Sequence, residues 1–325
     1  MKTRMKSLLL GCAMGLLFSH AHASAESDWP TRTIKIVSPY GAGGPNDLSA
    51  RLLGEQLGNR LGQPVVVENR TGAGTAIGNQ YVATAPADGY TLLYAAAPYS
   101  TLGALNEKLS YDPNKDLQPV AKVASAPLFL VVNADTPFQN ASDLIKYGKD
   151  HSNGLTLGSP GHGSLPHLAA ELLLRDADVK GVVVQYKGDV AAYTELLAGR
   201  LDATLTAITA ALPHIQAGKL RVLGVASEKP SAIYPEAPAL KDEGLPNVIA
   251  SGWYGFMVPS GTPAAIVDRL DKEINGTLND PDIQKKLLDY GLEVTAGDQA
   301  EFRRFIQSEM DKWGDVIQKA GIKAQ

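Results

Sequence analysis

The sequence predicts a two-domain α/β protein in which each domain is a mostly parallel β-sheet flanked by helices, with a cleft between the domains. The 325 residues suit two domains of ~150 residues each, and 44% of them are hydrophobic, which is enough for two cores. Short apolar strands alternate with helices, as in sheets buried on both faces. A strand, a glycine-rich turn and a helix also follow one another twice. We expect domain 1 to comprise residues 24–123 and 250–325, and domain 2 residues 124–249.

The N-terminus has the three parts of a secretory signal peptide. A basic region, an apolar stretch and a small-residue cleavage signal are found in order at Lys2, Arg4 and Lys6, at residues 8–18 and at Ala21-His-Ala23. We expect residues 1–23 to be removed, although cleavage after Ala25 suits the pattern nearly as well. Cys12, the only cysteine, lies in this segment, so the mature chain has no disulfide. The expected location is the periplasm.

A glycine-rich turn organises the first domain. The β-branched run Thr33–Val37 predicts a strand, and leucines at helical spacing predict a helix over residues 47–61. Three glycines lie within residues 41–44, and Pro45 suits the first position of a helix. Free backbone N–H groups and the positive end of the helix dipole meet at such a turn, which therefore predicts an anion site.

The rest of domain 1 is predicted from short apolar runs and helical periodicity. We expect a strand, a helix and a strand at residues 65–68, 75–85 and 91–96. The apolar run 120–132 predicts a strand that crosses into domain 2 and then that domain's first strand, and residues 248–258 predict the return crossing. Helices from Pro263 onward are expected to rejoin domain 1. The last helix has one apolar face, which predicts a buried core contact, formed by Phe302, Phe305, Ile306, Trp313, Val316 and Ile317.

Domain 2 repeats the alternation of strand and helix. We expect helices at residues 141–149, 165–175, 190–197 and 210–217, and strands at 155–157, 181–185, 203–206 and 220–226. Its glycine-rich turn, Gly158–Ser164, again separates a strand from a helix. Neither turn contains Lys or Arg, so a bound carboxylate would be held by N–H groups and hydroxyls. The same lack of cations argues against phosphate. The two turns are expected to close on one small anion from opposite sides.

Several segments carry a family resemblance in addition to the two turns. They are Gly62–Gly74, Pro86–Leu93, Tyr111–Asp116, Tyr186–Gly188, Gly218–Val222 and Trp253–Pro263. Their ordered set resembles the Bug-type receptors, the periplasmic solute-binding proteins of tripartite tricarboxylate transporters. The resemblance implies a type II-like periplasmic binding protein that captures a small organic carboxylate. It also implies two integral membrane partners, one large and one small, and no enzymatic reaction.

The candidate ligand-binding residues follow predicted strands or belong to the two turns. They are Tyr40, Gly43, Gly44, Asn46, Asp47, Tyr99, Ser100, Ser159, Gly161, His162, Gly163, Ser164, Tyr186, Thr206, Ala207 and Thr209. The carboxyl ends of strands in open α/β sheets are where ligands bind. Flat tyrosine faces and hydroxyls favour a planar or aromatic dicarboxylate as the ligand.

Several of these assignments have alternatives that the sequence leaves open. Asp47 either interacts with the dipole of its own helix or accepts a hydrogen bond from the ligand. His162 either contacts the ligand or faces solvent, and His167, in the first turn of its helix, is expected behind the loop. Each tyrosine either lines the cleft or packs in a core. Asn46 stands where the resembling family often has Thr or Ser.

Other functional classes find little support. Clustered Cys and His spacings typical of a metal site are missing, and no Gly-x-Ser-x-Gly motif or Walker lysine occurs, so we expect no cofactor, metal or catalytic residue. The net charge of −4, more negative once the basic leader is removed, disfavours nucleic acid and anionic membranes. We expect a monomer. Amino-acid or amide binding, and presentation of a ligand to a histidine kinase, remain alternatives to carboxylate transport.

Overall fold

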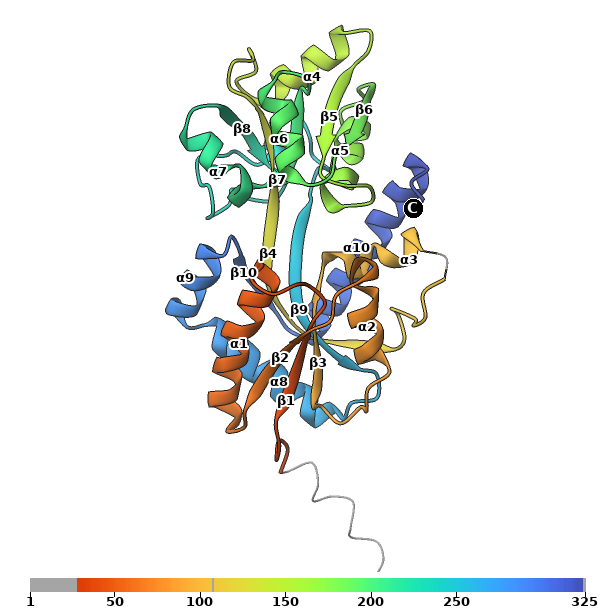
Figure 1. Ribbon diagram of the computed structural model, residues 1–325, viewed down its shortest axis with the longest axis vertical. Coiled ribbons are helices and arrows are strands. Elements are labelled where there is room, and N and C mark those ends of the chain that lie inside the picture. Colours follow the sequence, from red (N-terminus) through yellow and green to blue (C-terminus); the bar gives the residue numbers. More distant parts are fainter. Residues whose placement is uncertain (1–27, 107, 324–325) are drawn as a thin grey trace, which may run out of the picture.

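The computed structural model describes residues 28–106 and 108–323, which form two lobes stacked along the long axis of the molecule (Figure 1). Each lobe is a β-sheet covered by helices, so the predicted α/β class is confirmed. The signal peptide expected at residues 1–23 lies outside the described residues. Within the described part of the chain, no helix is both long enough and apolar enough to cross a membrane.

Lobe 1 is built on a sheet with the strand order β2-β1-β3-β9-β4, and β10 pairs with β4 as well. β1 runs parallel to β2 and β3, whereas β9 is antiparallel to β3 and β4. The elements that belong to this lobe alone are β1 (Ile34–Ser38), α1 (Pro45–Leu61), β2 (Val65–Asn69), the 3-10 turn η1 (Ala73–Thr75), α2 (Ala76–Ala83), β3 (Thr91–Ala96), η2 (Ala97–Ser100), α3 (Leu102–Leu105), α8 (Ala264–Leu278), α9 (Pro281–Asp289) and β10 (Glu293–Gly297).

Lobe 2 is built on a sheet with the strand order β8-β4-β7-β5-β6. β5 runs parallel to β6 and β7, and β4 is antiparallel to β7 and β8. Every helix and strand predicted between residues 141 and 226 is present within a few residues. The elements are α4 (Ala141–Asp150), β5 (Leu155–Ser159), α5 (Leu165–Asp176), β6 (Gly181–Gln185), α6 (Asp189–Leu197), β7 (Ala203–Ala207), α7 (Ile208–Gln216), β8 (Leu220–Val225) and η3 (Leu240–Glu243).

Two strands connect the lobes (Figure 1). The run predicted to be a crossing strand followed by another strand is one unbroken strand of 17 residues, β4 (Leu117–Asn133). Residues 117–127 of β4 pair with β9 (Ser251–Pro259), whereas residues 128–133 pair with β7 and β8. In lobe 2, alternate β4 side chains enter different cores, which explains the nearly continuous apolar sequence.

The last helix, α10 (Gln299–Ala320), packs on both lobes. Phe302 and Ile306 join Trp253 in a lobe 1 core, whereas Trp313 and Val316 join Leu168 in the core of lobe 2. The predicted apolar face is therefore buried, but it is divided between two cores. We expected every helix after Pro263 to pack in domain 1, but the second half of α10 packs on lobe 2. A long amphipathic helix can leave its own sheet when a second apolar surface lies along its axis.

The contact between α10 and β9 is close because Gly255 has no side chain. A Cβ atom at Gly255 would lie 2.3 Å from Cζ of Phe302 and 2.9 Å from the carbonyl oxygen of Ala121. On the same strand, a Cβ at Gly252 would make only ordinary contacts, at 3.4 Å or more. Gly255 thus sets how closely α10 approaches β9.

We expect Gly255→Ala to lower the free energy of unfolding by about 1–3 kcal/mol, because the added methyl group overpacks the core. Gly252→Ala, the matched control on the same strand, should change it much less. Urea unfolding followed by circular dichroism measures both. Equal losses in the two variants would show that the contact with Phe302 is not the constraint.

Candidate functional site

The turn after β1, residues 38–47 (loop 1), is held by buried side chains at both ends. The Ser38 hydroxyl donates to Oδ1 of Asn46 at 2.7 Å, and the Asn46 amide donates to the carbonyl oxygen of Tyr94 at 3.3 Å. Both residues are buried. The Asn46 side chain therefore ties α1 to β1 and β3. These two bonds give Asn46 a structural role, and its assignment as a ligand contact stays a prediction.

Asp47 fixes the glycine turn itself. Its side chain is buried, and its carboxylate accepts hydrogen bonds from the Gly43 N–H at 2.9 Å, from Nδ2 of Asn69 at 2.8 Å and from Nε of Arg51 at 3.1 Å. Burial alone would raise the pKa of Asp47, but these hydrogen bonds hold it below its usual value. Of the two roles open from sequence, the contacts favour the structural one. The Gly43 N–H is likewise engaged and is not free for an anion.

The turn after β5, residues 159–167 (loop 2), repeats this construction. The Gly163 N–H donates to Nδ1 of His167 at 2.9 Å, and the Ser164 hydroxyl caps α5 by accepting from the His167 N–H at 3.4 Å. The Ser164 hydroxyl also donates to the carbonyl oxygen of Gly161 at 2.7 Å. Next to this loop, the Tyr186 N–H donates to the carbonyl oxygen of Ser159 at 2.8 Å. His167 lies behind the loop, as its position in the helix indicates.

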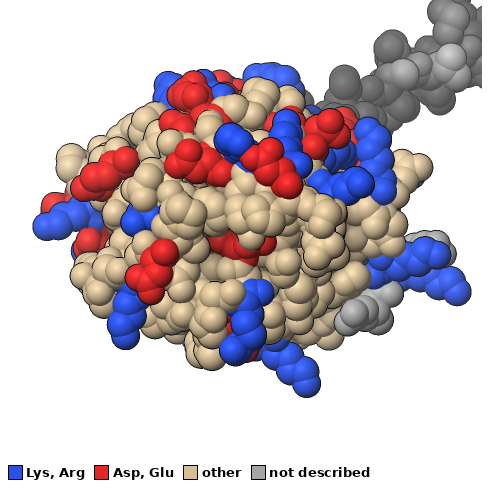
Figure 2. Space-filling model, turned by 90° about the horizontal axis from the view of Figure 1, so that it is seen from above, with Lys and Arg blue, Asp and Glu red and all other residues tan. Residues whose placement is uncertain are grey.

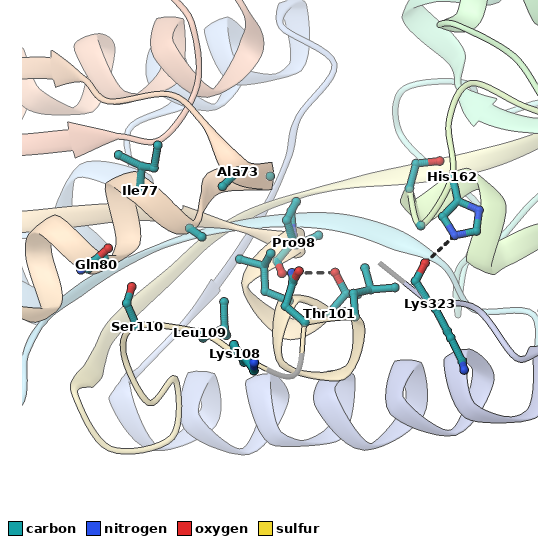
Figure 3. Close-up of a pocket in the computed structure, with 18 of the residues that line it drawn as sticks. Ala73, Ile77, Gln80, Pro98, Thr101, Lys108, Leu109, Ser110, His162 and Lys323 are labelled. Carbon is teal, nitrogen blue, oxygen red and sulfur yellow. Dashed lines mark hydrogen bonds between the residues drawn. The ribbon is translucent and has the colours of Figure 1, made fainter. Parts of the chain in front are cut away.

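A cavity of about 700 Å³ lies between the lobes at loop 2. His162, Gly163 and Ser164 form its lobe 2 side, and Nε2 of His162 lies 2.7 Å from the carbonyl oxygen of Lys323. Figure 3 shows this pair on one side of the cavity and Ala73, Ile77 and Gln80 on the other. Most of its surface is apolar. The remaining lining residues are Gly74, Ala76, Ala97, Pro98, Thr101, Leu102, Leu105, Asn106, Lys108, Leu109, Ser110 and Leu165.

Two predicted contacts, Tyr99 and Ser100, lie in the core of lobe 1 instead of on an open surface. Tyr99 is 1% exposed, its hydroxyl donates to the carbonyl oxygen of Pro113 at 2.5 Å, and its ring meets the edge of Trp253. Ser100 is also buried, and its hydroxyl has no hydrogen-bond partner among the described residues. The 3-10 turn η2 directs both side chains inward. Neither residue lines the interlobe cavity, and their assignment as ligand contacts stays a prediction.

The other two candidate tyrosines are half-buried. Burial raises the pKa of Tyr40, whose carbonyl oxygen accepts from Nδ2 of Asn69 at 3.0 Å. Tyr186 packs beside Val184 against a core of lobe 2. Of the described residues that line the interlobe cavity, none is a tyrosine. The sequence pattern thus placed these rings at strand ends without revealing which way they point.

The three candidate ligand contacts at the end of β7 lie in different environments. Thr206 is buried, and its hydroxyl lies 2.5 Å from the hydroxyl of Tyr193, so its assignment as a ligand contact stays a prediction. Ala207 and Thr209 are exposed. Thr209 lies against Gly291 of lobe 1, where a Cβ atom on that glycine would be 2.6 Å from Cγ2 of Thr209. Thr209 therefore contributes to a contact between the lobes.

Sequence reasoning missed the lobe 1 side of the cavity. Just before the helix predicted at residues 75–85, the structure makes Ala73–Thr75 a 3-10 turn whose first two residues line the cavity. Ile77, Gln80 and Thr101 also line it. A signal was present, because Gly72 and Gly74 follow a strand just as the glycines of loops 1 and 2 do.

The charged residues bear on two other kinds of site, a metal site and a nucleic-acid surface. Among residues 28–106 and 108–323, no group of His, Cys, Asp and Glu is arranged to hold a metal ion. On the face of the molecule shown in Figure 2, acidic and basic side chains are interspersed without a continuous basic surface. That face therefore lacks the electrostatic footprint expected for nucleic acid.

Comparison with known proteins identifies the family. The family model described as the tripartite tricarboxylate transporter family receptor matches residues 49–322, which is most of the chain. The chain belongs to this family. Its members are solute-binding receptors, so this receptor is not an enzyme.

Known relatives cover nearly the whole receptor. Protein BugT of Bordetella pertussis (strain Tohama I) is 33% identical over 305 residues, 93% of each chain. A TctC solute-binding protein from Polaromonas, solved without ligand, has a TM-score of 0.80 at 26% identity and covers 90% of this chain and 99% of its own. Rpa4515 of R. palustris, solved with adipate, has a TM-score of 0.75 at 32% identity and covers 92% and 100%.

We expect Asp47→Asn to destabilise the receptor at pH 7 by about 1–2 kcal/mol, because a buried charge-assisted hydrogen-bond network is weakened. The pKa of Asp47 is lowered in the folded state, so its stabilising effect is present at neutral pH and is lost as the pH falls below about 4. The difference between the two proteins should therefore shrink in acid.

Urea unfolding at pH 7 and pH 3 measures this difference. Asp135→Asn, an exposed carboxylate in lobe 2, serves as the control and should have little effect at either pH. A destabilisation by Asp47→Asn that is as large at pH 3 as at pH 7 would contradict the role given to the ionised carboxylate.

Proposed function

We propose that this receptor captures a small organic dicarboxylate between its lobes and delivers it to the membrane subunits of a tripartite transporter. The observation that carries the proposal is the interlobe cavity, in which the capped N-terminus of α5 borders an otherwise largely apolar space. Membership of the receptor family supports the class of function. The adipate found in the similar R. palustris protein supports the class of ligand.

One carboxylate of the ligand is proposed to bind at loop 2. The positive end of the α5 dipole favours an anion there, and those N–H groups of the loop that make no bond within it would donate to the carboxylate. Such hydrogen bonds to a charged acceptor are strong without a cation. Within the candidate set, Ser159, Gly161, His162, Gly163 and Ser164 are the proposed contacts on this side. The loop 1 candidates Tyr40, Gly43 and Gly44 do not line this cavity and stay predictions from the sequence.

The body of the ligand is proposed to lie along the apolar walls. Ile77, Leu102, Leu105 and Leu109 offer surface for an apolar chain or ring, with Lys108 at the rim for a second carboxylate. We place planar aromatic dicarboxylates first, since a rigid body loses less conformational entropy on binding. The support for this order is the apolar cavity rather than stacking on Tyr99, which is buried. Flexible dicarboxylates such as adipate come next.

The cellular setting follows from the same proposal. We infer that residues 1–23 are removed on export to the periplasm, and that the mature chain acts there as a monomer beside one large and one small integral membrane subunit. We also retain domain boundaries at residues 123/124 and 249/250. The first boundary falls within β4 and the second just before β9, so a hinge in these two strands would join the domains.

We expect terephthalate at a hundredfold excess over its Kd to stabilise the receptor by about 2.7 kcal/mol, because it binds only the folded state. Thermal unfolding measures the shift, and calorimetric titration compares terephthalate with adipate, benzoate and citrate. Benzoate lacks the second carboxylate and should bind more weakly. Equal binding of benzoate and terephthalate would rule out a second carboxylate site, and no response to any of the four would count against dicarboxylate capture.

Gly163 offers a test of loop 2 with a matched control. Gly163 and Gly218 both have φ of +68°, so alanine costs similar backbone strain at each. A Cβ at Gly163 would lie 3.2 Å from Cδ1 of Leu105, whereas Gly218 lies in open space in the turn before β8. We expect Gly163→Ala to weaken dicarboxylate binding at least tenfold and Gly218→Ala to leave it unchanged. Equal affinities in the two variants would exclude loop 2 from the site.

A further inference from the structure

Each of the two glycine loops contains a hydrogen bond of the same kind. The two bonds differ only in the acceptor. In loop 1 the Gly43 N–H donates to the Asp47 carboxylate, and in loop 2 the Gly163 N–H donates to Nδ1 of His167. The donor–acceptor distance is 2.9 Å in both bonds. Each donor is a glycine with positive φ, and each acceptor lies four residues later in the first turn of a helix. Each bond fixes the shape of its turn.

The two acceptors respond differently to acid. A carboxyl group has acceptor oxygens in both of its protonation states, whereas an imidazole nitrogen accepts only while it carries no proton. Because Nδ1 of His167 accepts, its proton resides on Nε2, which lies 3.6 Å from Oε1 of Glu171. His167 is 4% exposed, so water has little access to replace a lost bond.

We propose that His167 is a positioning residue that makes loop 2, and with it ligand capture, dependent on pH. A proton on Nδ1 would place two donors face to face and release the Gly163 N–H, so the loop would lose the shape that holds the carboxylate. Imidazoles take up this proton between pH 5 and 8. The effect on capture rests on the proposed function of loop 2, whereas the effect on the loop does not.

The charge on a protonated His167 would act in the opposite direction, by attracting an anion. Two titratable groups are recorded against this imidazole in the described part of the chain. Glu171, on the same helix, lies where it would neutralise most of the added charge. His162, whose ring centroid is 5.2 Å away, lines the cavity, and its protonation would attract a carboxylate directly. The loss of the loop bond is therefore the larger effect for His167, and the two histidines have opposite expected effects.

The first experiment needs no ligand. Nuclear magnetic resonance of the full mature chain labelled with ¹⁵N reports the tautomer of His167 and the amide shift of Gly163 from pH 8 to pH 5.5. We expect the Nε2–H tautomer at pH 8, and a Gly163 amide that moves together with the His167 titration. In His167→Asn, where Oδ1 replaces Nδ1 as an acceptor that does not titrate, the Gly163 amide should stay in place. An Nδ1–H tautomer at pH 8 would overturn the proposal.

The second experiment measures calorimetric binding of terephthalate at pH 8 and pH 6. In the wild-type receptor and in His162→Gln we expect Kd to rise at least threefold at pH 6. His167→Asn should bind as the wild type does at pH 8 and lose the rise, and His167→Ala should bind weakly at both. The coupling to pH would be overturned if the rise in Kd persisted in His167→Asn. It would also be overturned if neither the wild type nor His162→Gln showed a rise in Kd.

The two experiments separate this proposal from the proposed function. If terephthalate does not bind at any pH, the dicarboxylate proposal fails while the resonance titration still decides whether His167 controls the loop. If terephthalate binds but the Gly163 amide does not follow His167, the receptor proposal stands and the positioning role is wrong.

Discussion

The backbone hydrogen bonds of β4 hold both lobes in one structure. The strand leaves one sheet and enters the other without a break, so its residues pair with β9 in lobe 1 and with β7 and β8 in lobe 2. Buried backbone groups that lose their partners are costly, so neither half of β4 can leave its sheet without a large penalty. The lobes can therefore move only as far as β4 and β9 can bend or twist between their ladders. This limit keeps loop 2 facing lobe 1 across a cavity of defined size.

Local sequence patterns were sufficient for most of the fold. The elements of lobe 2 could be predicted because each strand is a short apolar run and each helix begins near a small polar residue, glycine or proline. The apolar run of β4 could be recognised as strand because both of its faces are buried, as at Phe129 and Leu130, but it was predicted as two strands instead of one. The division of α10 between two cores could not be predicted, since an apolar face does not state which surface it covers.

The candidate site was less predictable than the fold. The two glycine turns were recognised because free backbone near a helix N-terminus has one evident use. A strand end predicts where Tyr99 and Ser100 lie, but the 3-10 turn η2 decides the direction of their side chains, which are buried. The structural role of Asp47 depends on Arg51 and Asn69, and the latter is far away in sequence. The cavity-lining α2 residues belong to a helix whose exposed apolar side chain, Ile77, has no distinctive pattern.

α10 adds a third connection to β4 and β9. Its first half is fixed to lobe 1 by Phe302 and its second half to lobe 2 by Trp313, and Arg175 of α5 pairs with Asp315 at 2.9 Å. Two adjacent strands alone permit bending and twisting in several directions, but a rigid helix anchored at both ends blocks those that would stretch or shear it. Of the motions that the strands allow, a rotation about an axis close to α10 would stretch or shear that helix least. Lys323, just beyond the end of α10, and its partner His162 would stay near that axis, so the cavity would open mainly at its opposite wall, residues 73–80, and a solute would enter and leave past that wall.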